Sequence, residues 1–405
     1  MTTPEPGDRG NPFQFLLGDL MKMLGGASGA AWETSRAFAL QVATDGEAEG
    51  NVDPVQRIRV EELCRVAELH VAEATGLPVT PDGQRLTCLP VGRGDWALRA
   101  LEAWRPVLEA MTPPAGAPAV PPGTDLTADL TTGADDLSAL MGMWAGTIGP
   151  MLTALQAGSV VGHLAQRAVG QYVLPLPWPA NGELLVVPSN VEEFASDWSL
   201  PAEEALLWVC ARELAANSVV GRPHVHARLT GLLTELAGVA AATQQGLMDR
   251  LGGPMGGMAD PEAISNLFSD PDALLADLLL PDARRPSEQL TALAIVIDAY
   301  ADRIADRVGT ALTGSHAQLA EAWYRRRIER GRGEEAAAAL FGIDVDTAQV
   351  DRGRSFLAGV VERSDEAELT RLWASPSNLP TPAEVDAPGL WLERIRLPEL
   401  DEPGG

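Results

Sequence analysis

Two adjacent charged residues, Arg212 and Glu213, lie in the middle of the apolar run from Leu206 to Val220 and are the first candidates for a reactive site. In the helical motif H-E-x-x-H, two histidines four residues apart share a zinc ion, while the glutamate between them activates a bound water. Here Glu213 holds the glutamate position, but the two histidine positions hold Arg212 and Ala216. A guanidinium has no lone pair to offer and a methyl group has no donor atom, so neither binds zinc.

The residues around this run indicate one long core helix. Ser199 can cap its start, Pro201 suits a first turn, and Gly221 with Pro223 ends it. The run is apolar on every side, which is typical of a helix buried in a protein core. The plain alternative to a former metal site is therefore an ordinary core helix that carries one ion pair.

A second ionisable residue has an equally apolar setting. Asp298 lies in the stretch Ala292–Ala301, whose all-round apolar pattern also predicts a buried helix. A buried carboxylate without a partner is costly, and Arg212 offers a planar fork of donors that suits one. We hypothesise that an ion pair between Arg212 and Asp298, with Glu213 as a candidate third member, occupies the place of the lost metal centre. The alternative is that Asp298 faces solvent or caps a neighbouring segment.

Other candidates for a metal site are scattered along the chain. If a metal binds, the candidate ligands are Asp298, His163, His224 and His226. His224 and His226 are two residues apart, so they can share an ion only from an extended segment. The alternative is that both are surface histidines.

Most of the chain has the periodicity of helices. Apolar residues recur three and four positions apart over Phe13–Gly26, Ala31–Ala43, Asp53–Gly76, Gly94–Met111 and Asp135–Gln156. Strand patterns are few, one over Leu184–Val187 and a weaker one over Leu86–Val91. These patterns predict a mainly α protein with a small β-sheet, of the α+β class.

Several segments, in order and spacing, resemble the actinobacterial zincin-like metallopeptidase family, a group of uncharacterised hydrolases with one branch linked to deazaflavin-coenzyme biosynthesis. The segments that carry the resemblance are Gly158–Pro177, Glu183–Ala195, Leu206–Val220, Pro286–Gly309, Tyr324–Val345 and Leu372–Pro388. The resemblance implies a zincin-like fold with a central motif helix and a small sheet, whose edge strand lines a substrate cleft. The run Leu184–Val187 is the candidate for that edge strand.

The resemblance also shows where this chain departs from the family signature. Members with the full signature have histidine at the positions of Arg212 and Ala216, so the H-E-x-x-H motif is degenerate here. Glu213 then remains as a vestigial general base, and Asp298 matches an acidic family position that is a candidate third ligand. The resemblance therefore implies a fold without supplying the metal.

We expect four regions along the chain. Residues 1–30 form an N-terminal arm with an amphipathic helix, and residues 31–130 form a helical region that ends in the Pro-rich connector Pro113–Gly123. Residues 131–395 form the zincin-like core, and residues 396–405 form a flexible tail.

Composition limits the partners and the compartment. The 405 residues carry a net charge of -26, which opposes binding to nucleic acid or to an anionic membrane surface. The sequence has no run long and apolar enough for a membrane span and no signal sequence. The three cysteines, Cys64, Cys88 and Cys210, share no motif spacing, and their odd number indicates reduced thiols. We therefore expect a cytoplasmic protein.

Three functional interpretations follow. The favoured one is a non-catalytic pseudo-peptidase that keeps the cleft and Glu213, needs no cofactor and binds a peptide or protein. The second is an active zinc-dependent hydrolase with a rearranged site built from the candidate ligands above. The third is a scaffold that makes its contacts through Phe13–Gly26 or through the arginine-rich segment Arg325–Arg332, which otherwise reads as a solvated helix end.

Overall fold

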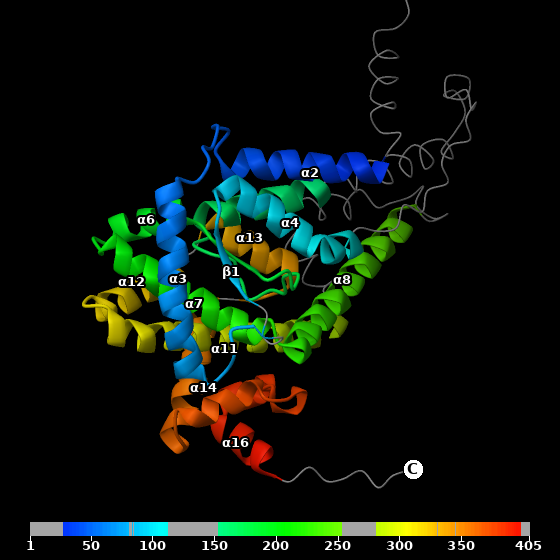
Figure 1. Ribbon diagram of the computed structural model, residues 1–405. Coiled ribbons are helices and arrows are strands. Elements are labelled where there is room, and N and C mark those ends of the chain that lie inside the picture. Colours follow the sequence, from blue (N-terminus) through cyan, green and yellow to red (C-terminus); the bar gives the residue numbers. More distant parts are fainter. Residues whose placement is uncertain are drawn as a thin grey trace, which may run out of the picture.

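A computed structural model describes residues 27–111 except 81, 82 and 84, residues 153–252, and residues 281–397 except 330 and 345. Its elements, shown in Figure 1, are α2 (Ala27–Ala43), α3 (Pro54–Thr75), β1 (Thr87–Pro90), α4 (Arg93–Ala110), β2 (Glu183–Val186), α6 (Pro188–Asp197), α7 (Ala202–Val220), α8 (Pro223–Gly252), α11 (Pro281–Leu312), α12 (His316–Ile328), α13 (Arg332–Phe341), α14 (Thr347–Arg363), η2 (Ala367–Trp373), η3 (Pro376–Asn378), α15 (Pro382–Asp386) and α16 (Pro388–Arg396). A further helical segment spans residues 153–167. The prediction of a mainly α protein with a small sheet is confirmed.

Helix α7 is the centre of the fold. All of its residues from Ala205 to Val220 are buried, because α3, α6, α8 and α11 pack around it. In Figure 1, α3 crosses in front of α7, and α11 packs against both α7 and α3. The helix begins at Ala202 without a side-chain cap, so the expectation that Ser199 caps it is wrong; Ser199 instead has a left-handed backbone in the preceding turn.

Helix α11 is the second central element. It packs against α7, α8 and α14 along its length, and every residue from Ala292 to Ala301 is buried. A helix in contact with neighbours on all sides needs apolar residues on all sides, which is the pattern in its sequence. Any charged side chain on the inner parts of α7 and α11 must therefore find its partner inside the protein.

The sheet has two parallel strands, in which Thr87 of β1 lies opposite Glu183 of β2 and Pro90 lies opposite Val186. Each strand lies within one or two residues of its predicted run. The second edge of β2 is also closed, because the segment after the 153–167 helix pairs with it: Gln171 N donates to Leu185 O at 3.0 Å, and Val187 N donates to Val169 O at 2.9 Å.

The expectation that Leu184–Val187 offers a free edge to a cleft is therefore wrong. The reason is local: the helix over residues 153–167 ends beside the strand, so the chain that leaves it runs antiparallel to β2 and forms a bridge at Gly170.

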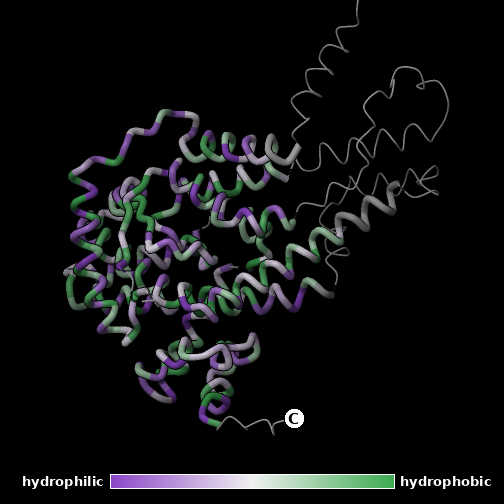
Figure 2. The backbone as a smooth tube through the Cα atoms, turned by 45° about the vertical axis from the view of Figure 1, so that its right-hand side comes forward, coloured by the Kyte–Doolittle hydropathy of each residue, from purple (hydrophilic) through white to green (hydrophobic). Residues whose placement is uncertain are grey.

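The outer helices carry mixed sequence. Figure 2 shows hydrophilic and hydrophobic residues alternating along them, and none of the described helices is both long enough and apolar enough to cross a bilayer. The predicted helix Phe13–Gly26, the connector Pro113–Gly123 and most of the predicted helix Asp135–Gln156 lie outside the described residues.

Candidate functional site

Arg212 contacts three carboxylates in the middle of the core. Its Nη1 donates to Glu213 Oε1 at 2.9 Å, its Nη2 to Asp298 Oδ1 at 2.7 Å, and its Nε to Asp302 Oδ1 at 2.9 Å. Nη1 also donates to the carbonyl of Tyr172 at 3.0 Å. The side chains of Arg212 and Glu213 are 2% and 0% exposed, so this contact is made without solvent.

A second guanidinium completes the arrangement. Arg327, from α12, donates to Asp298 Oδ2 at 2.8 Å and to Asp302 Oδ2 at 2.9 Å. Asp298 and Asp302 are four residues apart on α11, so both carboxylates lie on one face of that helix and are bridged by both arginines. We call Arg212, Glu213, Asp298, Asp302 and Arg327 the arginine–carboxylate cluster.

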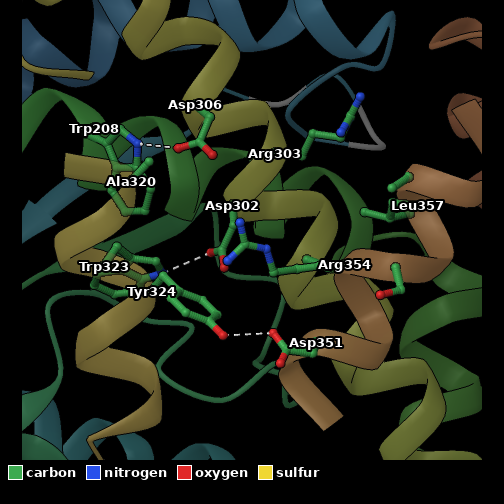
Figure 3. A pocket seen from close by; sticks show the side chains of 13 residues that line it. Trp208, Asp302, Arg303, Asp306, Ala320, Trp323, Tyr324, Asp351, Arg354 and Leu357 are labelled. Carbon is green, nitrogen blue, oxygen red and sulfur yellow. Dashed lines mark hydrogen bonds between the residues drawn. The ribbon is translucent and has the colours of Figure 1, made fainter. Parts of the chain in front are cut away.

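Trp323 covers one side of the cluster. Its ring lies 4.9 Å from the Arg212 guanidinium carbon, and its indole N–H donates to Asp302 Oδ1 at 3.0 Å, the bond drawn in Figure 3. The ring also packs against Trp208 and Phe194, at 5.1 and 5.8 Å between centroids. An aromatic face over a desolvated guanidinium adds a favourable cation–π contact.

Glu213 has both carboxylate oxygens engaged. Oε1 accepts from Arg212, and Oε2 accepts from the backbone N–H of Tyr172 at 2.6 Å. The chain just before Tyr172 packs directly on the carboxyl group, since a Cβ at Gly170 would lie 2.5 Å from Glu213 Cδ. A general base must be within reach of the proton that it removes, and here protein atoms fill that space.

Burial and charge act in opposite directions on the pKa values of the cluster. Burial raises the pKa of Glu213, and the charge of Arg212 with the Tyr172 N–H bond opposes this. Burial likewise raises the pKa of Asp298, against Arg327 and Arg212. For Arg212, burial lowers the pKa but the surrounding carboxylates, Asp302 foremost, outweigh it, so its pKa lies above the usual value and it stays charged.

The other predicted site residues lie apart from one another. Ala216 is buried one turn beyond Arg212, with 2% of its surface exposed. His163 Nδ1 contacts the carbonyl of Ser159 in its own helix at 2.8 Å.

The histidines after α7 face other neighbours. His226 Nε2 lies 3.3 Å from Trp178 O. His224 lines a separate hollow beside Leu379 and Pro382, where burial, with the charge of Arg222, lowers its pKa. Across the described ranges, no three or more His, Cys, Asp or Glu side chains are grouped so that they could hold a metal ion. Of the four candidate metal ligands, only Asp298 belongs to the cluster.

Within the arginine-rich segment, the expectation of a solvated helix end is wrong for Arg326 and Arg327, which are half-buried and contact the rest of the protein. Arg325 does pair with Glu321 at the surface, at 2.6 Å. Arg327 belongs to the cluster, and Arg326 donates to the carbonyl of Arg167 while its guanidinium lies 5.3 Å from the ring of Phe194. Burial, with the charge of Arg167, lowers the pKa of Arg326 to about 10.

Three functional residues were missed at the sequence level: Asp302, Arg327 and Tyr172. Asp302 had a usable signal, because it follows Asp298 by one helical turn. No sequence signal identified Arg327, since nothing in Arg325–Arg327 shows which arginine faces the core and which faces solvent. Tyr172 contributes only backbone atoms, which no side-chain pattern reveals.

Two of the cysteines meet although they share no motif. Cys64 Sγ on α3 lies 3.1 Å from Cys210 Sγ on α7, and the thiols are free and buried. Hydrogen bonding to Cys210 and Cys88, together with burial, holds the pKa of Cys64 well above its usual value. The Cys64 thiol is therefore a protonated core group at neutral pH.

A small hollow of about 50 Å³ lies beside the cluster. Its apolar wall comes from Val169, Val173, Leu174 and Val350, and its polar wall from Arg167, Arg212, Asp298, Arg326, Arg327 and Glu334. Arg212 and Asp298 line this hollow, but Glu213 does not.

Comparison with known proteins gives two matches. The model of a family described as zincin-like metallopeptidase matches residues 31–392. A crystal structure from Chloroflexus aurantiacus, named a "putative hydrolase with a novel fold", superposes with a TM-score of 0.56 at 20% sequence identity, over 91% of this chain and 99% of that one. No curated protein matches significantly. The structural likeness shows a shared fold.

Proposed function

The chain belongs to the zincin-like metallopeptidase family, and we propose that it is a non-catalytic member in which the arginine–carboxylate cluster takes the place of a metal centre. The main support for the proposal is that Glu213 has no free carboxylate oxygen. One oxygen accepts a hydrogen bond from Arg212 and the other accepts one from the Tyr172 N–H, both inside the core.

Zinc does not fit the residues at this site. The first ligand position holds Arg212, which is cationic and donates to Glu213, Asp298 and Asp302. The second holds Ala216, which has no donor atom. A divalent cation at this point would lie against a guanidinium, and the carboxylates that could attract it already have two arginines as counter-ions.

We propose further that the small hollow beside the cluster admits one side chain of a peptide or protein ligand that binds over its mouth. Because both edges of β2 are hydrogen-bonded, the ligand cannot add a strand there and must be held by side chains. The hollow offers an apolar wall that includes Val173 and the guanidinium of Arg326 as a donor.

The other two interpretations have less support. An active hydrolase with a rearranged site needs Asp298 and histidines around one ion, and His163, His224 and His226 each contact a different part of the fold. A scaffold that uses Arg325–Arg332 loses two of its arginines, Arg326 and Arg327, to contacts within the protein.

The proposal is tested by metal content and hydrolysis together. Protein purified without chelators should contain well below one zinc per chain by mass spectrometry, and it should cleave no peptide library above the level of a Glu213→Gln variant. The matched control is Glu321→Gln, which removes an exposed carboxylate and should change neither reading. Stoichiometric zinc that Glu213→Gln abolishes would overturn the proposal and favour an enzyme.

The binding part has its own test. Val173→Trp fills the hollow from its half-buried wall, and Val66→Trp makes the same addition at an exposed position on α3. Peptides selected on the intact protein should lose affinity for the first variant alone. If both variants bind them equally, the ligand does not occupy the hollow.

A further inference from the structure

A larger pocket opens on the far side of Trp323 from the hollow. Helices α7, α11, α12 and α14 enclose a cavity of about 520 Å³, which is within the size range of small-ligand sites. Three aromatic side chains, Trp208, Trp323 and Tyr324, line it beside small residues such as Ala320. Figure 3 shows these rings on one side of the pocket, with Asp306 and Arg354 on α11 and α14.

Most charges around the pocket are already matched. Asp302 forms ion pairs with Arg212 and Arg327 of the cluster. Arg303 pairs with Glu366. These groups are therefore neutralised by the protein before any ligand arrives.

Asp351 and Arg354 stand on α14, where both are exposed. Asp351 Oδ1 accepts from the Tyr324 hydroxyl at 2.9 Å, the second bond drawn in Figure 3. The Arg354 guanidinium lies 4.5 Å from the centre of the Tyr324 ring. Both groups thus meet at Tyr324 and close one end of the pocket.

Asp306 is the exception among the half-buried groups. Its carboxylate accepts from the Trp208 indole N–H at 3.2 Å, and it forms no ion pair with any residue of the described ranges. Burial, with the negative charge of Asp302, raises the pKa of Asp306 to about 6. At pH 7 it is mostly ionised, so a partly desolvated negative charge lines an aromatic pocket, and the positive charges of Arg354 and Arg303 act on it from beyond ion-pair distance.

We propose that this pocket binds an alkylammonium group, with Asp306 as its counter-ion and the rings of Trp208 and Tyr324 against its methylene chain. An ammonium supplies the charge-assisted hydrogen bond that Asp306 lacks, and aromatic faces attract cations and pack their apolar stems. The net charge of -26 favours the approach of a cation. This goes beyond the proposed function, because neither Glu213 nor the hollow takes part.

Two sources carry this chemistry, a free small amine and the lysine side chain of a peptide. Calorimetric titration of the intact protein with n-butylammonium and with N-acetyl-lysine methylamide distinguishes them. If the source is a peptide, the lysine derivative binds more tightly; if it is a free amine, butylammonium binds at least as well. Either outcome supports the proposal, and binding of neither overturns it.

Neutral probes of the same shape test the charge. Butanol and the doubly acetylated lysine methylamide keep the alkyl chain and remove the cation, so they should bind at least about tenfold more weakly than the amines. Equal binding of charged and neutral probes would show that the pocket recognises the chain alone and would overturn the assignment to Asp306.

Substitutions test whether Asp306 contacts the ammonium group. Asp306→Asn keeps the shape and should weaken amine binding by about tenfold or more, whereas Asp197→Asn, at an exposed aspartate on α6, should leave it unchanged. Ala320→Trp fills the pocket without changing a charge and should abolish binding, which keeps the proposal testable if Asp306→Asn does not fold. Binding that survives both changes, or an equal loss in Asp197→Asn, would overturn it.

The pH dependence of amine affinity is a further test, because a residue that only supported the fold would not produce it. Asp306 faces Trp208 of α7, Asp302 and Arg303 of α11, and Arg354 of α14. Amine affinity should fall as the pH drops from 7 towards 5, because Asp306 takes up a proton, and Asp306→Asn should remove most of this dependence. An unchanged profile in the variant would contradict the proposal.

Discussion

Arg212 is the residue on which the core of this protein depends. Its guanidinium is buried on α7 and hydrogen-bonds to three carboxylates from two helices. Removing one partner of a buried ion pair leaves charges that neither water nor protein compensates, which is more damaging than the loss of the contact itself. The cluster therefore fixes how α7, α11 and α12 meet.

Replacing Arg212 by Met should lower the free energy of unfolding by about 3–5 kcal/mol, because Asp298 and Asp302 then share Arg327 alone. Urea unfolding measures the loss. The control is Arg325→Met, whose exposed pair with Glu321 is of a kind that contributes about 0.3–0.5 kcal/mol. Losses of equal size in the two variants would show that the cluster adds no particular stability.

Asp306 should make stability depend on pH. Its folded pKa of about 6 lies above its ordinary value of 3.8, so between these values the folded state binds more protons than the unfolded state. Stability from this group is therefore full below pH 3.8 and is lost as the pH rises through 6. Asp306→Asn should raise the melting temperature at pH 7 and leave it nearly unchanged at pH 4. A variant less stable than the wild type at pH 7 would contradict this.

Among the helices and strands, hydrophobic periodicity was sufficient to predict the fold class and the two core helices, α7 and α11. A helix buried on all sides must be apolar on all sides. The sequence also led us to pair Arg212 with Asp298, which lie 2.7 Å apart. That this pair stands in for a metal centre is still a proposal.

Other features could not be predicted, because they depend on contacts between distant segments. The second edge of β2 is closed by residues 169–171, whose sequence has no strand pattern. The inward direction of Arg327 depends on how α12 crosses α11, and a rotation of α12 by about 100° would turn the neighbouring Arg326 inward instead.

Helix α7 still presents positions 212 and 216 one turn apart, so the double variant Arg212→His, Ala216→His should gain a zinc site beside Glu213 and Asp298. Zinc should raise its melting temperature, and neither the wild type nor the single variant Ala216→His should respond. We expect no peptide cleavage by the double variant, because the Tyr172 N–H still engages Glu213. A variant indifferent to zinc would show that α7 no longer presents the motif geometry.

For the whole molecule, the dominant quantity is the net charge of -26 over 405 residues. The arginine–carboxylate cluster contributes little to it, since two guanidiniums oppose three carboxylates inside the core. Like charges that are exposed to solvent repel one another, and salt screens this repulsion.

Raising the salt concentration from about 0.01 M to about 0.1 M shortens the Debye length from about 30 to about 10 Å, so it should raise the melting temperature. Differential scanning calorimetry at pH 7 measures the shift. The buried cluster is screened far less than surface charge, so Arg212→Met should show a similar salt dependence. A melting temperature that falls with salt would mean that surface ion pairs outweigh the net repulsion.

The close packing of Gly170 on Glu213 has an evolutionary consequence. To use Glu213 as the general base of a zinc site, a descendant would have to replace Arg212, supply a donor at Ala216 and move the chain at Tyr172 away from the glutamate. Arg212→His alone leaves Asp298 and Asp302 short of positive charge, and a large side chain alone at the buried Ala216 overfills the core. Each first step is harmful by itself, so the proposed loss of catalysis could not be reversed by a series of single neutral substitutions.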